Sequence, residues 1–312
     1  MGQIVTLTVN PSVDKSTTVK SIVPEQKLRC ESPKYEPGGG GINVSRAISQ
    51  LGGTSKAIFF AGGHMGKFFT ELIDQHIKAY EIININEDTR ENFIVVESTS
   101  NNQYRFGMEG PSIREEEWQQ SLTLLNSIND IEFLVASGSL SPGIPKDYYA
   151  KVAKIAKSKG ASFILDTSGE PLRLAANEGV YLLKPNLSEL SALAGVEELQ
   201  LDQVDEQARK IIDQGQCEAV VVSLGGSGAL LVTKDIVEHI PAPPVKKNST
   251  VGAGDSMVAG MVLTLFNKGT FSEAARYGVA CGTAATMNFG TELCHKDDAD
   301  SLFVWINKRM NQ

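Results

Sequence analysis

The 312-residue chain is 41% hydrophobic and 21% charged, which suits a large buried core in one big α/β domain or two smaller ones. Its formal net charge of −8 argues against nucleic acid and anionic membranes as partners, although a small anionic substrate needs only a local basic pocket. No apolar run approaches the length of a membrane span, and the N-terminus lacks a leader pattern, so we expect a cytoplasmic protein.

Short apolar runs alternate with longer amphipathic segments along the chain. Nearly continuous apolar strands between helices indicate a mainly parallel sheet that is covered on both faces. The expected strands are 4–9, 56–62, 131–138, 162–167, 180–184, 218–225 and 228–233. The expected helices are 42–51, 65–77, 114–128, 146–159, 203–214, 254–267, 271–286 and 297–309.

Two segments break this alternation. Residues 16–36 and 90–108 have the alternating pattern of antiparallel strands joined by turns, and "SNNQ" at 100–103 is typical of a hairpin turn. These segments therefore predict a small second sheet, which either covers a cleft or pairs with another subunit.

The first glycine-rich motif is "PGGGGINVSRAISQLGG" at 37–53. Four successive glycines let the backbone approach a ligand closely, and the helix that follows offers free N–H donors. Asn43 at the junction is a candidate to bond a sugar hydroxyl, whereas a flexible loop with a helix cap is the alternative. The Gly-Lys-Ser/Thr ending of a P-loop is absent, and no GxGxxG follows the first strand, so both nucleotide-binding motifs are disfavoured.

Three further motifs follow predicted strands, at the edge where open parallel sheets bind ligands. Asp14 is expected at the end of the first strand, where its carboxylate is suited to two sugar hydroxyls; a turn-forming role is the alternative. In "KPNLSEL" (184–190), Lys184 is suited to a phosphate and the Asn186–Glu189 pair to hydrated Mg²⁺, but the same pattern is also a helix start. "SLGGSGALL" (223–231) is either a phosphate cradle or a simple hairpin.

The strongest single motif is "STVGAGDSMVAGMVLTLF" at 249–266. Its apolar residues from Met257 to Leu265 fall on one helical face, so a helix begins at about Gly254 and the N–H groups of 252–255 form an anion hole. Asp255 projects from the first turn beside this hole. We expect the positive helix end to lower the pKa of Asp255 and make it a weak base.

These motifs occur in one order over essentially the whole chain, together with "SGSLSPG" (137–143). The combination resembles the ribokinase-like (PfkB) carbohydrate kinases, and "DTSGE" (166–170), "NFGTELC" (288–294) and Gly40 within the glycine run are most similar to the minor bacterial 6-phosphofructokinase branch. The resemblance implies a three-layer αβα core of residues 1–15, 37–89 and 109–312. It also implies a β-sheet lid of residues 16–36 and 90–108 that forms the contact of a homodimer.

The resemblance implies transfer of the ATP γ-phosphoryl group to the 1-hydroxyl of fructose 6-phosphate, which gives fructose 1,6-bisphosphate and ADP in glycolysis. Asp255 would be the base, and the N–H groups of Gly252, Ala253 and Gly254 would stabilise the transferred group. Tagatose-6-phosphate kinase and 1-phosphofructokinase remain alternatives within the family. A non-catalytic sugar-phosphate sensor is an alternative of another class, and such a sensor should have lost Asp255 or the "GAG" run.

The remaining site residues are also implied by the resemblance. Those implied for the sugar are Asp14, Gly38, Gly39, Asn43 and Ser139. Those implied for the 6-phosphate are Lys27, Arg29, Arg90 and Arg105, with Lys27 acting across the dimer. Those implied for ATP are Lys184, Asn186, Ser223, Gly225, Gly228, Ser249, Thr250, Val251, Val279 and Thr283. Glu189 would hold Mg²⁺ through water, and the positions implied for K⁺ are Ser249, Val251, Ala285, Asn288 and Gly290.

Two regulatory features of the relatives stay open in this chain. The relatives carry arginine where this chain has Glu292, which leaves K⁺ dependence unsettled. They are also inhibited by a second MgATP, and the resemblance implies a tetramer when ATP is in excess. No position in the sequence identifies that second ATP site.

Overall fold

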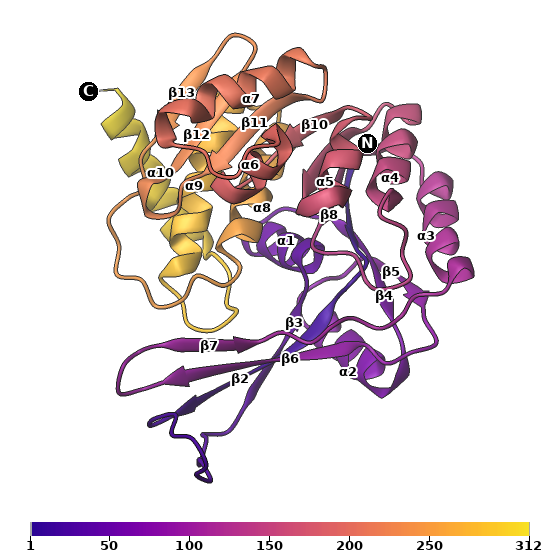
Figure 1. Ribbon diagram of the computed structural model, residues 1–312, viewed down its shortest axis with the longest axis vertical. Coiled ribbons are helices and arrows are strands. Elements are labelled where there is room, and N and C mark those ends of the chain that lie inside the picture. Colours follow the sequence, from indigo (N-terminus) through magenta and orange to yellow (C-terminus); the bar gives the residue numbers. More distant parts are fainter. Residues whose placement is uncertain (1, 312) are drawn as a thin grey trace.

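The computed structural model describes residues 2–311, and two β-sheets organise them (Figure 1). The larger sheet has nine strands in the order β13-β12-β11-β10-β9-β8-β1-β4-β5. All neighbours from β11 to β5 are parallel, and β12 and β13 extend one edge in antiparallel pairing. The strands are β1 (Gln3–Thr8), β4 (Lys56–Ala61), β5 (Tyr80–Asn84), β8 (Ile131–Ser137), β9 (Ser162–Asp166), β10 (Val180–Leu183), β11 (Cys217–Ser223), β12 (Ala229–Thr233) and β13 (Val237–Ile240).

Helices cover both faces of the large sheet, as its continuous apolar strands require. One face packs against α3 (Glu115–Ser127), α4 (Tyr148–Ser158), α5 (Gly169–Ala176), α6 (Leu187–Ala194) and α7 (Val204–Asp213). The other packs against α1 (Gly40–Gln50), α2 (Gly63–Asp74), α8 (Ala253–Phe266), α9 (Phe271–Thr286) and α10 (Lys296–Met310). The predicted three-layer αβα core is therefore confirmed.

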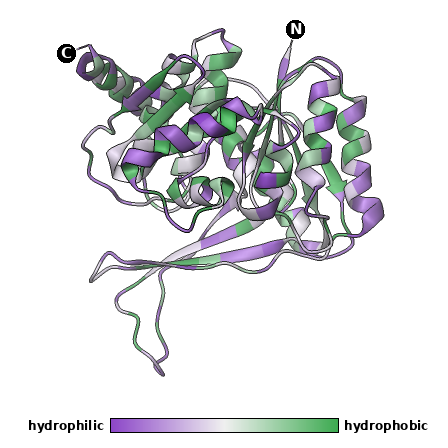
Figure 2. Cartoon of the chain, turned by 45° about the horizontal axis from the view of Figure 1, so that its top comes forward, coloured by the Kyte–Doolittle hydropathy of each residue, from purple (hydrophilic) through white to green (hydrophobic). Residues whose placement is uncertain are grey.

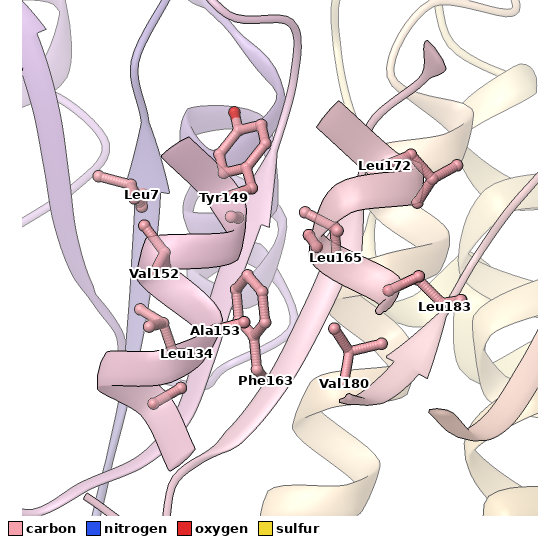
Figure 3. Packing of buried hydrophobic residues seen from close by; sticks show 14 of the residues in the cluster. Leu7, Leu134, Tyr149, Val152, Ala153, Phe163, Leu165, Leu172, Val180 and Leu183 are labelled. Carbon is pink, nitrogen blue, oxygen red and sulfur yellow. The ribbon is translucent and has the colours of Figure 1, made fainter. Parts of the chain in front are cut away.

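Strand β8 illustrates how one sequence run serves both cores. Leu134 belongs to the cluster beneath α4, whereas Phe133 and Val135 belong to the cluster beneath α8. In Figure 3, Tyr149 and Val152 of α4 lie against Leu134 and the neighbouring strands. Figure 2 shows the same division by hydropathy, with apolar residues on the strands and hydrophilic residues on the outer helix faces. Burial of this apolar area is the main stabilising contribution to the fold.

The smaller sheet has the order β3-β2-β6-β7 and extends from the large one (Figure 1). Its strands are β2 (Ser12–Val19), β3 (Lys34–Gly38), β6 (Arg90–Glu97) and β7 (Gln103–Phe106). The predicted hairpin at "SNNQ" is confirmed, since β6 and β7 are antiparallel and Asn101 takes the left-handed conformation.

Three details of the small sheet differ from the sequence prediction. The sheet begins at Ser12, not at residue 16, and it includes Gly38 at its other boundary. Strands β2 and β6 pair in parallel, so the expectation of a wholly antiparallel sheet is wrong. Residues 20–33 form a projecting loop with a single bridge between Val19 and Cys30 (Figure 1).

Four short elements, β5, β13, α5 and α6, were absent from the predicted strands and helices. Each spans only four to eight residues, too few for periodicity to separate them from loops. Among residues 2–311, no helix is both long enough and apolar enough to cross a bilayer.

Candidate active site

The carboxyl ends of the central strands place polar side chains along one edge of the large sheet. Ser137 ends β8, Asp166 ends β9, Lys184 follows β10 and Ser223 ends β11. Asp14 was expected at this edge too, at the end of the first strand, and that prediction is wrong. It lies inside β2 of the small sheet, paired with Glu36 on one side and Asn92 on the other.

A cavity of ≈ 420 Å³ lies beside the N-terminal end of α8. Proline and valine side chains from the 242–245 segment line it on one side, and glycine loops line it on the other. It brings together most of the residues predicted for the nucleotide, namely Ser223, Gly225, Gly228, Thr250, Val279 and Thr283, with Ala253 and Gly254 of the predicted anion hole. Its size and mixed lining suit a nucleotide.

The N-terminus of α8 opens onto this cavity. The helix begins at Ala253 with Gly252 as its N-cap, one residue earlier than predicted. Gly252 has φ of +72°, and a Cβ there would lie 2.4 Å from Cδ2 of Leu293, so only glycine fits. Because the first N–H groups of a helix have no intrahelical acceptor, this end is suited to a phosphoryl group.

Asp255 lies in the first turn of α8 and contacts two neighbouring elements. Its Oδ2 accepts a hydrogen bond from Nδ2 of Asn43 at 2.9 Å, and its Oδ1 accepts one from Oγ of Ser137 at 3.4 Å. These contacts hold the carboxylate between the glycine-run helix α1 and strand β8. Asn43 therefore faces the predicted base, a contact that the sequence prediction of a sugar ligand did not include.

The pKa of Asp255 is the clearest correction to the sequence prediction. Burial, and after it the negative charge of Asp166, raises the pKa of Asp255 to about 6. Hydrogen bonds from Asn43 and the positive charge of Lys184 only partly oppose this shift. The expected lowering by the helix end is therefore wrong, because desolvation of the carboxylate outweighs it. A carboxylate with a pKa of about 6 is a more effective base near neutral pH.

Lys184 and Asp166 form a buried ion pair beside this carboxylate. Nζ of Lys184 lies 3.2 Å from Oδ1 of Asp166, and Lys184 is 6% exposed. Burial lowers the pKa of Lys184, but Asp166, Glu189 and Asp255 raise it by more, so the ammonium stays charged. A Cβ on Gly254 would lie 3.5 Å from Nζ, which places this charge next to the anion hole.

The Asn186–Glu189 pair forms the helix start that was the alternative to a metal role. Oδ1 of Asn186 accepts from N of Glu189, and Oε2 of Glu189 accepts from N of Asn186, both at 2.9 Å. Burial raises the pKa of Glu189, and Asp166 raises it further. The neighbouring carboxylates of Glu189 and Asp166 still offer the oxygen ligands that Mg²⁺ prefers, beside the candidate phosphate site.

The glycine run packs against the other side of the site. A Cβ on Gly38 would lie 2.3 Å from Oδ2 of Asp14, and one on Gly40 would lie 2.2 Å from Oγ of Ser137. Gly39 has φ of +112° and precedes α1. Glycine is therefore required at positions 38 and 40 because the side chains of Asp14 and Ser137 leave no room for a Cβ, whether or not a ligand also approaches the run. Ser139 is close by and accepts a hydrogen bond from Nδ2 of Asn10 at 3.2 Å.

The four basic residues predicted for the 6-phosphate do not lie close to one another within a single chain. Arg90 donates to the carbonyls of Asn10, Pro11 and Met108, and it lines a ≈ 590 Å³ cavity together with Ser139. Arg105 donates from Nη2 to Oγ1 of Thr250 at 3.0 Å, so it faces the anion-hole loop. Lys27 and Arg29 lie exposed on the projecting 20–33 loop.

The residues predicted for K⁺ cluster behind the anion hole. Oγ of Ser249 donates to the carbonyl of Gly290 at 2.8 Å and accepts from N of Val251 at 3.2 Å. N of Asn288 donates to the carbonyl of Ala285 at 3.3 Å. Glu292 contacts Nε2 of His295 at 2.9 Å.

The sequence prediction did not include several residues of the site. Ser137 and Asp166 end strands at the ligand-binding edge, so the rule that selected Lys184 should also have selected them. The segment 242–245, which lines the nucleotide cavity, has no periodic pattern and carries only a Pro-Pro pair as a signal. Arg46 and Glu36, described below, lie within or beside quoted motifs but face the interior.

Together these features define a class of protein. A carboxylate of raised pKa lies at a helix N-terminus, between a nucleotide-sized cavity and a group of polar side chains at the end of a parallel sheet. This arrangement is that of a small-molecule kinase, because phosphoryl transfer depends on positioning and on stabilisation of charge.

Comparison with known proteins gives the family. Residues 8–298 match the model of the pfkB family carbohydrate kinases, and the chain belongs to this family. It is 43% identical over 309 residues to ATP-dependent 6-phosphofructokinase isozyme 2 of Escherichia coli (strain K12), covering 99% of this chain and 100% of that protein.

Two solved structures of phosphofructokinase-2 from Escherichia coli are similar to this chain. The complex with potassium has a TM-score of 0.95 at 43% identity, and the complex with fructose-6-phosphate has a TM-score of 0.93 at 41% identity. Each comparison covers 98% of this chain and 100% of the other. The ribokinase-like fold is thereby confirmed.

Proposed function

We propose that this protein transfers the γ-phosphoryl group of ATP to the 1-hydroxyl of fructose 6-phosphate. The observation that carries the proposal is the position of Asp255 between the nucleotide cavity and the Asn43–Ser137 side of the site. The similarity to 6-phosphofructokinase isozyme 2 along the whole chain supports this choice of substrate.

The mechanism follows from the chain's own groups. Asp255 accepts a hydrogen bond from the attacking hydroxyl, orients it, and takes its proton as the phosphoryl group transfers. The N–H groups of Gly252, Ala253 and Gly254 stabilise the negative charge of that group, and the ammonium of Lys184 adds a positive charge beside it. In other enzymes, one such donor contributes about 3 kcal/mol to the stability of the transition state.

We propose Mg²⁺ bound with ATP and held through water by Glu189, with Asp166 beside it. The raised pKa of Glu189 and its closeness to Asp166 fit a cation site. When bound, the ion neutralises charge on the ATP phosphates.

We also propose K⁺ binding among Ser249, Val251, Ala285, Asn288 and Gly290, where the Ser249 hydroxyl contacts the carbonyl of Gly290 and the Ala285 carbonyl accepts from N of Asn288. The potassium complex of the Escherichia coli protein supports this site. Glu292 pairs with His295 and is compatible with K⁺ binding through its backbone. Rates in KCl should exceed those in a tetramethylammonium salt severalfold, and equal rates would remove K⁺ from the proposal.

We propose that the small sheet acts as a lid and as the contact of a homodimer, with Lys27 and Arg29 serving the partner's 6-phosphate site. Support comes from the exposure of both basic residues and of Tyr104, Phe106 and Met108 on or beside β7. A tetramer in excess ATP stays a prediction.

The test of the proposed reaction is ADP release over a panel of sugar phosphates. Fructose 6-phosphate should give the highest kcat/KM, above tagatose 6-phosphate and fructose 1-phosphate. A higher value for one of the other two would reassign the substrate within the family. No ADP with any member of the panel would favour the non-catalytic sensor.

A further inference from the structure

A buried ion pair lies directly behind the candidate base. Arg46 of α1 is 2% exposed and Glu36 of β3 is 6% exposed, and Nη2 of Arg46 lies 3.3 Å from Oε1 of Glu36. Buried ion pairs contribute little net stability, since both charges lose their hydration. A pair in this position therefore calls for a role other than stabilising the fold.

The pair reaches Asp255 through one amide. Nη1 of Arg46 donates to Oδ1 of Asn43 at 3.3 Å and to the carbonyl of Pro37 at 2.9 Å. Nδ2 of Asn43 then donates to Oδ2 of Asp255 at 2.9 Å. A guanidinium only donates and a carboxylate only accepts, so a single orientation of the Asn43 amide satisfies both neighbours.

Glu36 fixes the position of Arg46 from the side of the small sheet. Its Oε2 accepts from Oγ1 of Thr291 at 2.6 Å, and Nζ of Lys34 lies 3.3 Å from its Oε1. Burial raises the pKa of Glu36, but Thr291, Arg46 and Lys34 lower it by more, so Glu36 stays ionised. The small sheet is thereby joined to the amide that holds the base.

We propose that Arg46 is a positioning residue of the phosphoryl transfer, and that it acts by locking the Asn43 amide so that its NH₂ group always faces Asp255. Glu36 holds Arg46 in place for this purpose. The inference rests on the proposed function, in which Asp255 is the base. Without the lock, the amide is free to flip and to present its oxygen to the carboxylate, which would turn Asp255 away from the sugar hydroxyl and raise its pKa.

The charged groups that face Asp255 from other elements are few. Asp166 from β9 raises its pKa and Lys184 after β10 lowers it, and Ser137 of β8 adds a neutral hydrogen bond. None of these contacts runs through Arg46. Changes at Arg46 should therefore reach the base through Asn43.

The test compares Arg46→Met, the double variant Glu36→Gln/Arg46→Met and Arg46→Lys with the wild type. The double variant removes both charges, so the role of Arg46 can still be tested if Arg46→Met does not fold once Glu36 has lost its buried guanidinium partner. Both Met variants should lower kcat by roughly tenfold to a hundredfold while KM for fructose 6-phosphate stays within about threefold. The acid limb of the pH profile should move to higher pH, and Arg46→Lys should recover part of kcat.

A double-mutant cycle separates positioning from a general structural effect. In an Asn43→Ala background, loss of Arg46 should lower kcat no further, because the amide through which it acts is gone. The matched control is Glu238→Gln/Arg276→Met, which removes a second, less deeply buried ion pair, with Nε of Arg276 2.6 Å from Oε1 of Glu238. The control should leave the pH profile unchanged.

Two results would overturn the role of Arg46: a kcat within twofold of wild type in the Met variants, or losses that add fully to that of Asn43→Ala. Both are read against an active wild type. An inactive wild type would instead overturn the proposed reaction, so the two failures are distinguishable.

Discussion

The nucleotide side and the sugar-phosphate side of the site differ in how completely one chain builds them. On the nucleotide side, residues from β11, α8 and α9 enclose a ≈ 420 Å³ cavity. On the sugar-phosphate side, Arg90 is already bonded to three carbonyls, and Lys27 and Arg29 project on an exposed loop. The core thus forms a preorganised site, whereas the small sheet and its loop hold basic groups that one chain does not bring together.

Asp255→Asn tests the boundary between the two sides and should have the largest effect. Loss of a general base costs about 10²–10⁴-fold in rate, so kcat should fall by roughly 10³-fold while KM for ATP and for the sugar phosphate changes little. Steady-state ADP release and binding calorimetry measure both quantities. Turnover within tenfold of wild type would exclude Asp255 as the base.

Lys27→Ala tests the incomplete side. Loss of a charged hydrogen bond to a phosphate should lower kcat/KM for fructose 6-phosphate by about tenfold to a hundredfold, with KM for ATP unchanged. Lys20→Ala is the matched control, since this lysine is exposed at the base of the same loop. Equal effects of the two variants would show that only general surface charge matters.

The raised pKa of Asp255 predicts an acid limb. Below pH of about 6 the base is protonated, and kcat/KM should fall about tenfold per pH unit. Stability changes in the opposite sense. Because the folded pKa exceeds the unfolded value, protonated Asp255 stabilises the fold at low pH, and this contribution is lost as pH rises through about 6.

Asp255→Asn removes the free-energy cost of ionising a buried carboxylate. Allowing for partial exposure of the side chain, the variant should be about 1–2 kcal/mol more stable than wild type at pH 8, with the difference vanishing near pH 4. Denaturant unfolding at both pH values measures this. A variant less stable at pH 8 than at pH 4, relative to wild type, would contradict the raised pKa.

Gly228→Ala tests the preformed side and should have the smallest effect on rate. Gly228 has φ of +93°, and a Cβ would lie 1.9 Å from the carbonyl oxygen of Ile240, so the loop must shift. We expect KM for ATP to rise severalfold and stability to fall by about 1–3 kcal/mol. Gly226→Ala is the control, because its Cβ would meet only the flexible end of Lys247.

The sequence predicted what depends on periodicity and on local motifs. Helix α9 was predicted at its observed bounds, and the anion hole at 252–255 followed from the start of one apolar face. Contacts between distant segments were not predictable in this way. The sequence suggested a sugar contact for Asn43, but nothing in it shows that Nδ2 of Asn43 lies 2.9 Å from Oδ2 of Asp255.

The predicted lowering of the pKa of Asp255 was wrong for a related reason. The helix end is visible in the sequence, but the burial of the carboxylate and its closeness to Asp166 depend on tertiary structure that brings the end of β9 near the start of α8. Likewise, the parallel pairing of β2 with β6 joins strands that are far apart in the chain, so no turn signal announces it.

The central claim, that one chain completes the nucleotide side and a second chain completes the sugar-phosphate side, is tested most directly by mixed dimers. Asp255→Asn and Lys27→Ala chains, each strongly impaired alone at low fructose 6-phosphate, are unfolded and refolded together in equal amounts and assayed at that concentration. With twofold symmetry, half the dimers are mixed and have one intact site, so activity should recover to about a quarter of wild type. Activity no higher than the sum of the separate variants, with mixed dimers shown to be present, would contradict the claim.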